Sequence, residues 1–115
     1  MPTINDNNLQ RIWILVTLVP PGKVVSYGQL ADLAGLPGRA RLAGRALKLA
    51  PKAHNLPWHR VLNSQGKISL PKGSDGYQEQ VKRLQEEGVV VLSGKVKLAE
   101  FQWQPDLGEL LALPF

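Results

Sequence analysis

The first apolar positions of the chain recur three and four residues apart: Leu9, Ile12, Trp13, Val16 and Val19. This spacing predicts an amphipathic helix over residues 5–19. Asn5 or Asp6 can cap the start of this helix, and the run Pro20-Pro21-Gly22 ends it. A short extended segment, residues 23–25, follows.

The next apolar and polar positions predict two further helices joined by a tight turn. Ser26 is a suitable N-cap, and Gln29 stands three residues later, as in a capping box. The second helix then runs to Gly35, and a turn over residues 36–38 leads to a third helix over residues 39–49, which stops before Pro51. Two short helices around a glycine-containing turn indicate a helix-turn-helix.

The third helix has one basic face. At roughly 100° per residue, its basic side chains fall within an arc of about 60°. These are Arg41, Arg45 and Lys48, with Arg39 at the start of the helix. Ala43, Ala46, Leu47 and Ala50 gather on the opposite side. Gly44 adjoins the basic face, where the absence of a side chain allows a partner to approach closely. The face is either a solvated surface or a nucleic-acid docking surface, and the turn and Gly44 favour the second.

The second half of the chain predicts a fourth helix and a small hairpin. Ser74 or Asp75 can cap this helix, with Gln78 as a box partner for Asp75, and Gly88 ends it. Residues 89–98 alternate around Ser93-Gly94 as in a β-hairpin. We therefore expect a mainly α fold with a small β hairpin, similar to a winged helix-turn-helix. Residues 1–100 form the single domain, and residues 101–115 form a tail that is either packed or loose.

The amino-acid composition excludes several kinds of catalytic and metal site. A chain of 115 residues with a net charge of +5 is one domain with a preference for polyanions. It has no cysteine, which excludes thiolate nucleophiles, disulfides and cysteine zinc sites. His54 and His59 are its two histidines, too few to hold a metal. We expect no metal, no cofactor and no membrane partner, and a monomeric cytoplasmic protein associated with the nucleoid.

The run Pro57-Trp58-His59-Arg60-Val61 is the most informative motif. A lone tryptophan is usually a core residue with a hydrogen-bonded indole N–H, as we expect for Trp13 and Trp103. Trp58 differs, because it follows a proline and precedes two basic residues. An aromatic wall beside a basic helix suits a base turned out of a duplex. Stacking contributes about 1–3 kcal/mol, comparable to the few kcal/mol that extrusion costs.

From residue 23 to about residue 88, the chain resembles the DNA-binding domain of the O6-alkylguanine-DNA alkyltransferases. The segments KVVSYGQLADLAGLPGRARLAGRAL and PWHRVLNSQGKIS carry the resemblance. Trp58 occupies the position of the reactive cysteine, so the chain is more similar to the alkyltransferase-like proteins. This resemblance implies a protein that is not an enzyme. It implies binding of double-stranded DNA with O6-alkylguanine by base flipping, without dealkylation, and transfer of the lesion to nucleotide excision repair proteins.

The resemblance also implies roles for individual residues. Tyr27 matches a tyrosine that rotates the target nucleotide through its 3′ phosphate, and Arg41 matches an arginine finger that fills the gap left by the base. Gly44 matches a small residue that allows close contact with the minor groove. His59 and Glu87 match a pair that activates the cysteine through water, and here, with Arg60, they are expected to form a structural network.

The expected lesion pocket consists of Pro57, Trp58, Tyr27 and Lys72, and the expected DNA-binding surface adds the basic helix face. Two positions depart from the family. Ala50 replaces a hinge asparagine, and Pro71 stands where some relatives have an arginine.

Two other functions remain open at this point. A winged helix-turn-helix transcriptional regulator would read an operator sequence and ignore lesions. An enzyme working without cysteine would change the mass of a lesion-containing oligonucleotide.

Overall fold

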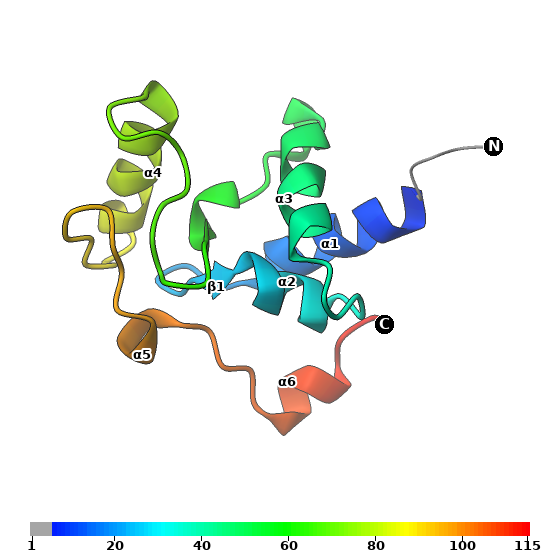
Figure 1. The fold of residues 1–115 in the computed structure, drawn as a ribbon. Helices are drawn as coiled ribbons and strands as arrows, with labels where there is room; N and C mark the ends of the chain where they lie inside the picture. The colour runs from blue at the N-terminus through cyan, green and yellow to red at the C-terminus, as the bar shows by residue number, and fades with distance from the viewer. Residues whose placement is uncertain (1–5) are drawn as a thin grey trace.

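A computed structural model describes residues 6–115, and three helices in its first half form a compact helical unit (Figure 1). They are α1 (Asp6–Leu18), α2 (Tyr27–Leu33) and α3 (Ala40–Leu49). All three lie close to their predicted bounds. The proposed cap Asn5 lies outside the described residues.

The start of α2 is tied to the C-terminal segment. The Ser26 side chain caps α2 by accepting a hydrogen bond from the backbone N–H of Gln29 at 3.1 Å. The predicted reciprocal capping box is wrong, because the Gln29 side chain is used elsewhere. Its amide nitrogen donates to the Trp103 carbonyl oxygen at 2.6 Å, and its amide oxygen accepts from Gln102 at 2.8 Å.

The second half of the chain contains short elements and one longer helix. These are the 3₁₀ turns η1 (Lys52–His54) and η2 (Trp58–Arg60), strand β2 (Val61–Leu62), and helices α4 (Asp75–Glu86), α5 (Leu98–Phe101) and α6 (Leu107–Leu111). Ser74, rather than Asp75, caps α4 by accepting from the Tyr77 backbone N–H at 3.2 Å. The mainly helical, alkyltransferase-like architecture predicted from the sequence is confirmed.

The β structure differs from the expected hairpin. Strand β1 (Val25–Ser26) pairs in parallel with β2, which joins the helix-turn-helix to the segment that carries Trp58. Residues 89–98 form a tight turn through Ser93 and Gly94 with a single bridge, Leu92 to Lys95, and no extended strand pair. After this turn, residues 94–96 pair instead with residues 66–68, where Lys95 bridges to Lys67.

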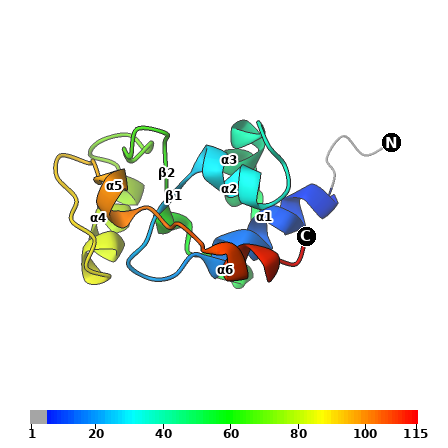
Figure 2. The same cartoon turned by 90° about the horizontal axis from the view of Figure 1, so that it is seen from below.

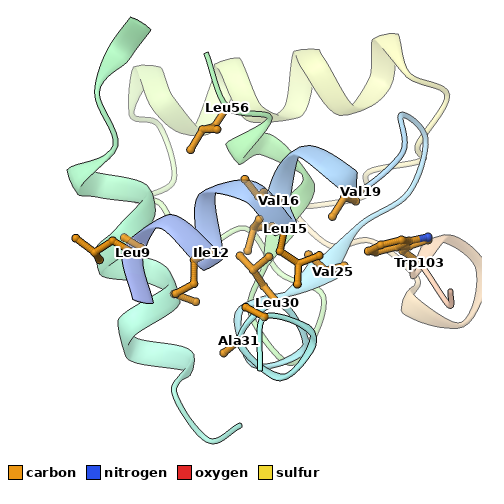
Figure 3. Close-up of a cluster of buried hydrophobic side chains, with 14 residues drawn as sticks. Leu9, Ile12, Leu15, Val16, Val19, Val25, Leu30, Ala31, Leu56 and Trp103 are labelled. Atoms are coloured by element: carbon orange, nitrogen blue, oxygen red, sulfur yellow. The ribbon is translucent and has the colours of Figure 1, made fainter. Parts of the chain in front are cut away.

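Two apolar clusters hold these parts together. The larger one joins α1, α2 and α3 with Leu56, Val61 and Trp103, and Figure 3 shows part of it around Leu15 and Leu30. The smaller one joins Val24 and Leu62 to Leu84 of α4 and to Val96. Because β2 contributes Val61 to the larger cluster and Leu62 to the smaller one, it connects the helix-turn-helix to the α4 region.

The C-terminal segment is anchored at its start. Trp103 is only 6% exposed, and its backbone N–H donates to the Val24 carbonyl oxygen at 2.8 Å. Beyond it, α6 lies at the bottom of the view in Figure 1 and on the near side in Figure 2. Leu107 and Leu111 of this helix are largely exposed. No helix within residues 6–115 is both long and apolar enough to cross a bilayer.

Candidate nucleic-acid interface

An open groove of about 890 Å³ separates α3 from the segment that leads from β2 to α4. Residues from α2, α3, η2, the 63–71 segment and α4 line it. The parallel β1–β2 pair sets this arrangement, since it fixes η2 next to the helix-turn-helix. The groove therefore lies between parts of the chain that are far apart in sequence.

One wall of the groove is basic. Arg41, Arg45 and Lys48 are exposed along α3 and line the groove, while Ala43 and Ala46 are fully buried on the opposite side. This division follows the helical spacing of the sequence. Arg39, the N-terminal neighbour of α3, lies outside the groove in an adjoining recess that shares Arg41 and Arg45 with it.

Gly44 and Tyr27 meet at the base of this wall. A Cβ atom added at Gly44 would lie 3.7 Å from the Tyr27 ring, within ordinary van der Waals contact. The Tyr27 hydroxyl forms a 2.9 Å hydrogen bond with the Ser69 hydroxyl on the other side of the groove. Tyr27 therefore bridges the two walls, and Gly44 leaves α3 open to a partner at this point.

Trp58 lines the groove at the start of η2. The guanidinium carbon of Arg83 lies 5.7 Å from the centroid of its ring, and Arg83 forms a 2.7 Å ion pair with Glu79 one helical turn earlier. Pro57 precedes η2 and is not among the described residues lining the groove. Sequence reasoning missed Arg83, because its contact with Trp58 spans 25 residues and leaves no local pattern.

The second wall comes from the segment after β2. It consists of Asn63, Ser64, Ser69, Leu70 and Pro71, with Gln80 of α4 behind it. The buried Gln80 side chain donates to the carbonyl oxygens of His59 and Val61, at 3.1 and 3.0 Å. These polar contacts were not predicted. Lys72, expected in the pocket, is exposed and does not line the groove, whereas Pro71 does.

His59, Arg60 and Glu87 form a partly buried network next to Trp58. Glu87 accepts a 2.8 Å hydrogen bond from His59 Nε2 and bonds of 2.7 and 3.0 Å from the Arg60 guanidinium. Arg60 also donates to the Val19 carbonyl oxygen at 2.9 Å, and the Gly22 N–H donates to Glu87. The network thus ties η2 to the end of α1 and to the end of α4.

The protonation states in this network are fixed by burial and by charge. Burial raises the pKa of Glu87, but hydrogen bonds from Arg60 and His59 outweigh it and lower that pKa to about 2. Burial lowers the pKa of His59 below 6.5, despite the opposing effect of Glu87. Glu87 is therefore ionised and His59 neutral at pH 7, with the proton on Nε2 and a lone pair on Nδ1.

The arrangement supplies a base without a nucleophile. His59 Nδ1 is buried and has no hydrogen-bond partner, and the neighbouring Trp58 ring lies edge-on to it at 6.2 Å between centroids. An indole has no atom that the histidine can activate for attack. Within residues 6–115, no group of three histidine or acidic side chains is placed to hold a metal ion.

Comparisons with known proteins identify the family to which the chain belongs. The family model described as "6-O-methylguanine DNA methyltransferase, DNA binding domain" matches residues 7–89. A "DNA base-flipping protein" of Vibrio parahaemolyticus is 46% identical over 101 residues, covering 87% of this chain and 99% of that protein. "Alkyltransferase-like protein 1" of Schizosaccharomyces pombe is 42% identical over 106 residues, covering 87% and 97%.

A solved structure agrees with these matches. The crystal structure of S. pombe Atl1 in complex with damaged DNA containing O6-carboxymethylguanine superposes with a TM-score of 0.80 and 38% identity. The match covers 90% of this chain and all of that one. The chain therefore belongs to the family of the 6-O-methylguanine DNA methyltransferase DNA-binding domain, as an alkyltransferase-like protein.

Proposed function

We propose that this protein binds duplex DNA and recognises O6-alkylguanine by turning the modified base out of the stack into the groove beside Trp58. The observation that carries this proposal is that Arg41 of α3 and Trp58 of η2 line the same groove. A cationic side chain can enter the base stack from α3, while the indole receives the displaced base. S. pombe Atl1, which shares this fold, has been solved with damaged DNA.

The basic wall supplies affinity without sequence selection. Arg41, Arg45 and Lys48 present three positive charges on successive turns of α3, and lysine and arginine contacts to phosphates dominate nonspecific DNA binding. Tyr27 lies beside Gly44, where α3 is narrowest, and is placed to press on a phosphate of the target nucleotide. These residues position the duplex, and the base itself is selected elsewhere.

Selection of the lesion follows because the free energy gained by stacking a base on Trp58 is similar to the cost of extruding it from the duplex. Stacking of a base on Trp58 contributes about 1–3 kcal/mol, and extrusion of a paired base costs a few kcal/mol, less when the pair is damaged. A sound guanine pair therefore stays stacked, while a weakened O6-alkylguanine pair opens into the groove. Leu70 and Pro71 provide apolar surface near Trp58 for the alkyl group.

The protein leaves the lesion unchanged. Alkyl transfer needs a nucleophile at the position of Trp58, and the chain contains no cysteine at all. The His59–Glu87 pair, held by Arg60, serves to fix η2 and the Trp58 backbone. A protein that marks a lesion without removing it depends on another system, and we assign that role to nucleotide excision repair. It acts as a monomeric, nucleoid-associated cytoplasmic protein whose core domain spans residues 1–100.

The test is a comparison of affinity for matched duplexes that carry guanine or O6-methylguanine at one position. The proposal expects tighter binding to the lesion at physiological salt, and no change in oligonucleotide mass after long incubation. Loss of the methyl group would show an enzyme instead. Selection of bound sequences from random DNA separates this function from that of a transcriptional regulator, since a regulator enriches an operator sequence and a lesion sensor does not.

A further inference from the structure

Two lysines face each other across a short antiparallel contact next to the groove. The Ile68 N–H donates to the Gly94 carbonyl oxygen and the Val96 N–H donates to the Gly66 carbonyl oxygen, both at 2.9 Å. These bonds flank the bridged pair Lys67 and Lys95 and make it a non-hydrogen-bonded pair. Side chains in such a pair stand closest together, with Cα atoms about 4.5 Å apart.

The backbone holds the two lysines in this position. Gly66 has a φ of 79°, and a Cβ atom there would lie 2.5 Å from the Val96 carbonyl oxygen, so a side chain at Gly66 would push the segments apart. Ile68 and Val96 are buried in the smaller apolar cluster, which turns Lys67 and Lys95 outward to solvent.

This pairing is unfavourable for the isolated protein. Like charges directly opposite each other destabilise a strand pair, and within residues 6–115 neither Lys67 nor Lys95 takes part in an ion pair. Two exposed lysines on directly opposite positions, neither of which forms an ion pair within residues 6–115, indicate a site for an anion supplied by a partner. The same repulsion would disappear once that anion is bound.

The lysine pair continues the surface of the groove. The Lys67 N–H donates to the side chain of Asn63, a groove residue, and the Asn63 N–H donates to the Lys67 carbonyl oxygen, both at 2.9 Å. Exposure alternates along residues 67–69, so Lys67 lies on the same face as Ser69. Because Ser69 bonds to Tyr27 inside the groove, Lys67 extends that face outward.

We propose that Lys67 and Lys95 form a phosphate clamp that binds the DNA backbone beyond the flipped nucleotide. The partner is a phosphodiester of the duplex held in the groove, so the inference rests on the DNA binding proposed above. The clamp is separate from the basic face of α3 and lies on the opposite side of the groove. It supplies affinity and orientation but no lesion selectivity, since a phosphate carries no information about its base.

The experiment measures the salt dependence of binding for Lys67→Gln/Lys95→Gln, with Lys52→Gln/Lys82→Gln as a control. All four lysines are exposed, and the control pair lies outside the groove. Each double variant loses two positive charges, so any difference between them comes from where the lysines lie. Each phosphate contact contributes about 0.9 to the slope of log affinity against log salt. We expect the clamp variant to lower that slope by about 0.9, because the two lysines bind one phosphate, and to weaken binding to guanine and O6-methylguanine duplexes by the same factor.

Each outcome decides the inference. A slope equal to that of the control variant overturns the clamp, as does a clamp variant that unfolds at a lower temperature than the parent, because relief of repulsion should keep or raise that temperature. Lys67→Gln alone should lower the slope by less than the double substitution does. A reduced slope in the clamp variant, together with no lesion preference in the parent, supports the clamp and overturns the lesion proposal. A parent that does not bind DNA overturns both.

Discussion

Arg83 lies over Trp58, with its guanidinium carbon 5.7 Å from the centroid of the indole ring. Trp58 lines the groove, whereas Arg83 is not among the described residues that do so. The ring is therefore placed between a cation on α4 and the space open to a base. Arg83 is itself held by Glu79, at 2.7 Å. The attraction between the guanidinium and the ring holds the indole toward α4.

Substitution of Arg83 by methionine should reduce the preference for lesion DNA. Methionine keeps most of the aliphatic stem but removes the cation, whose interaction with an exposed ring corresponds to about a two- to fivefold effect on affinity. The measurement is the ratio of dissociation constants for guanine and O6-methylguanine duplexes. Lys82→Met, with the same charge change on the next residue of α4, should leave the ratio unchanged. An Arg83→Met variant with the same ratio as the parent would show that Arg83 has no role in lesion preference.

Arg41 and Arg39 provide a matched pair of charge deletions. Arg41 lines the groove and is the proposed finger, while Arg39 lies in the adjoining recess. Arg41→Ala should lower the lesion preference by about tenfold, since the gap left by the flipped base is no longer filled. Arg39→Ala should weaken binding to both duplexes equally. Equal effects of the two substitutions on the ratio would show that Arg41 acts only through its charge.

Gly44→Ala should separate stability from binding. Alanine is favoured over glycine within a helix by about 1 kcal/mol, and the added Cβ meets only the Tyr27 ring at an ordinary 3.7 Å. The free energy of unfolding, measured with urea, should therefore rise. DNA affinity should fall, because the methyl group blocks close approach to α3. Unchanged affinity in the stabilised variant would contradict the role of Gly44 in DNA contact.

Acid should destabilise the fold through Glu87. Its pKa falls from 4.5 unfolded to about 2 folded, so its contribution is complete above pH 4.5 and is lost as pH falls toward 2. That difference corresponds to about 3 kcal/mol. His59, whose pKa is also lowered, adds a loss in the same direction below pH 6.5.

Urea unfolding of Glu87→Gln between pH 7 and pH 2 tests this contribution. The variant should be less stable than the parent at pH 7 and should lose less stability on acidification. Glu79→Gln is the control, since Glu79 is solvent-exposed and pairs only at the surface. A parental acid response in the Glu87 variant would place the sensitivity elsewhere.

Local sequence patterns predicted the parts of the fold that depend on neighbouring residues. The spacing of Arg41, Arg45 and Lys48 predicted the basic face of α3, and the burial of Ala43 and Ala46 agrees with it. The family resemblance, carried by the segment around Trp58, predicted the alkyltransferase-like fold, and the comparisons confirm the family.

Contacts between residues far apart in the chain could not be predicted from local sequence patterns. The parallel pairing of Val25 with Val61 joins segments 36 residues apart and depends on the packing of the whole core. The predicted capping box at Ser26 does not form, because the Gln29 side chain donates instead to the carbonyl oxygen of Trp103, 74 residues away. Arg83 likewise reaches Trp58 only because α4 packs against η2.

The most direct test of the central claim compares the parent with Trp58→Ala on two duplexes that differ by a single O6-methyl group. Affinities should be measured by equilibrium titration at physiological salt. We predict that the parent binds the lesion duplex more tightly, and that Trp58→Ala loses about 1–3 kcal/mol of that preference while binding the guanine duplex as the parent does. Equal affinity of the parent for both duplexes, or a lesion preference that survives without the indole, would contradict this prediction.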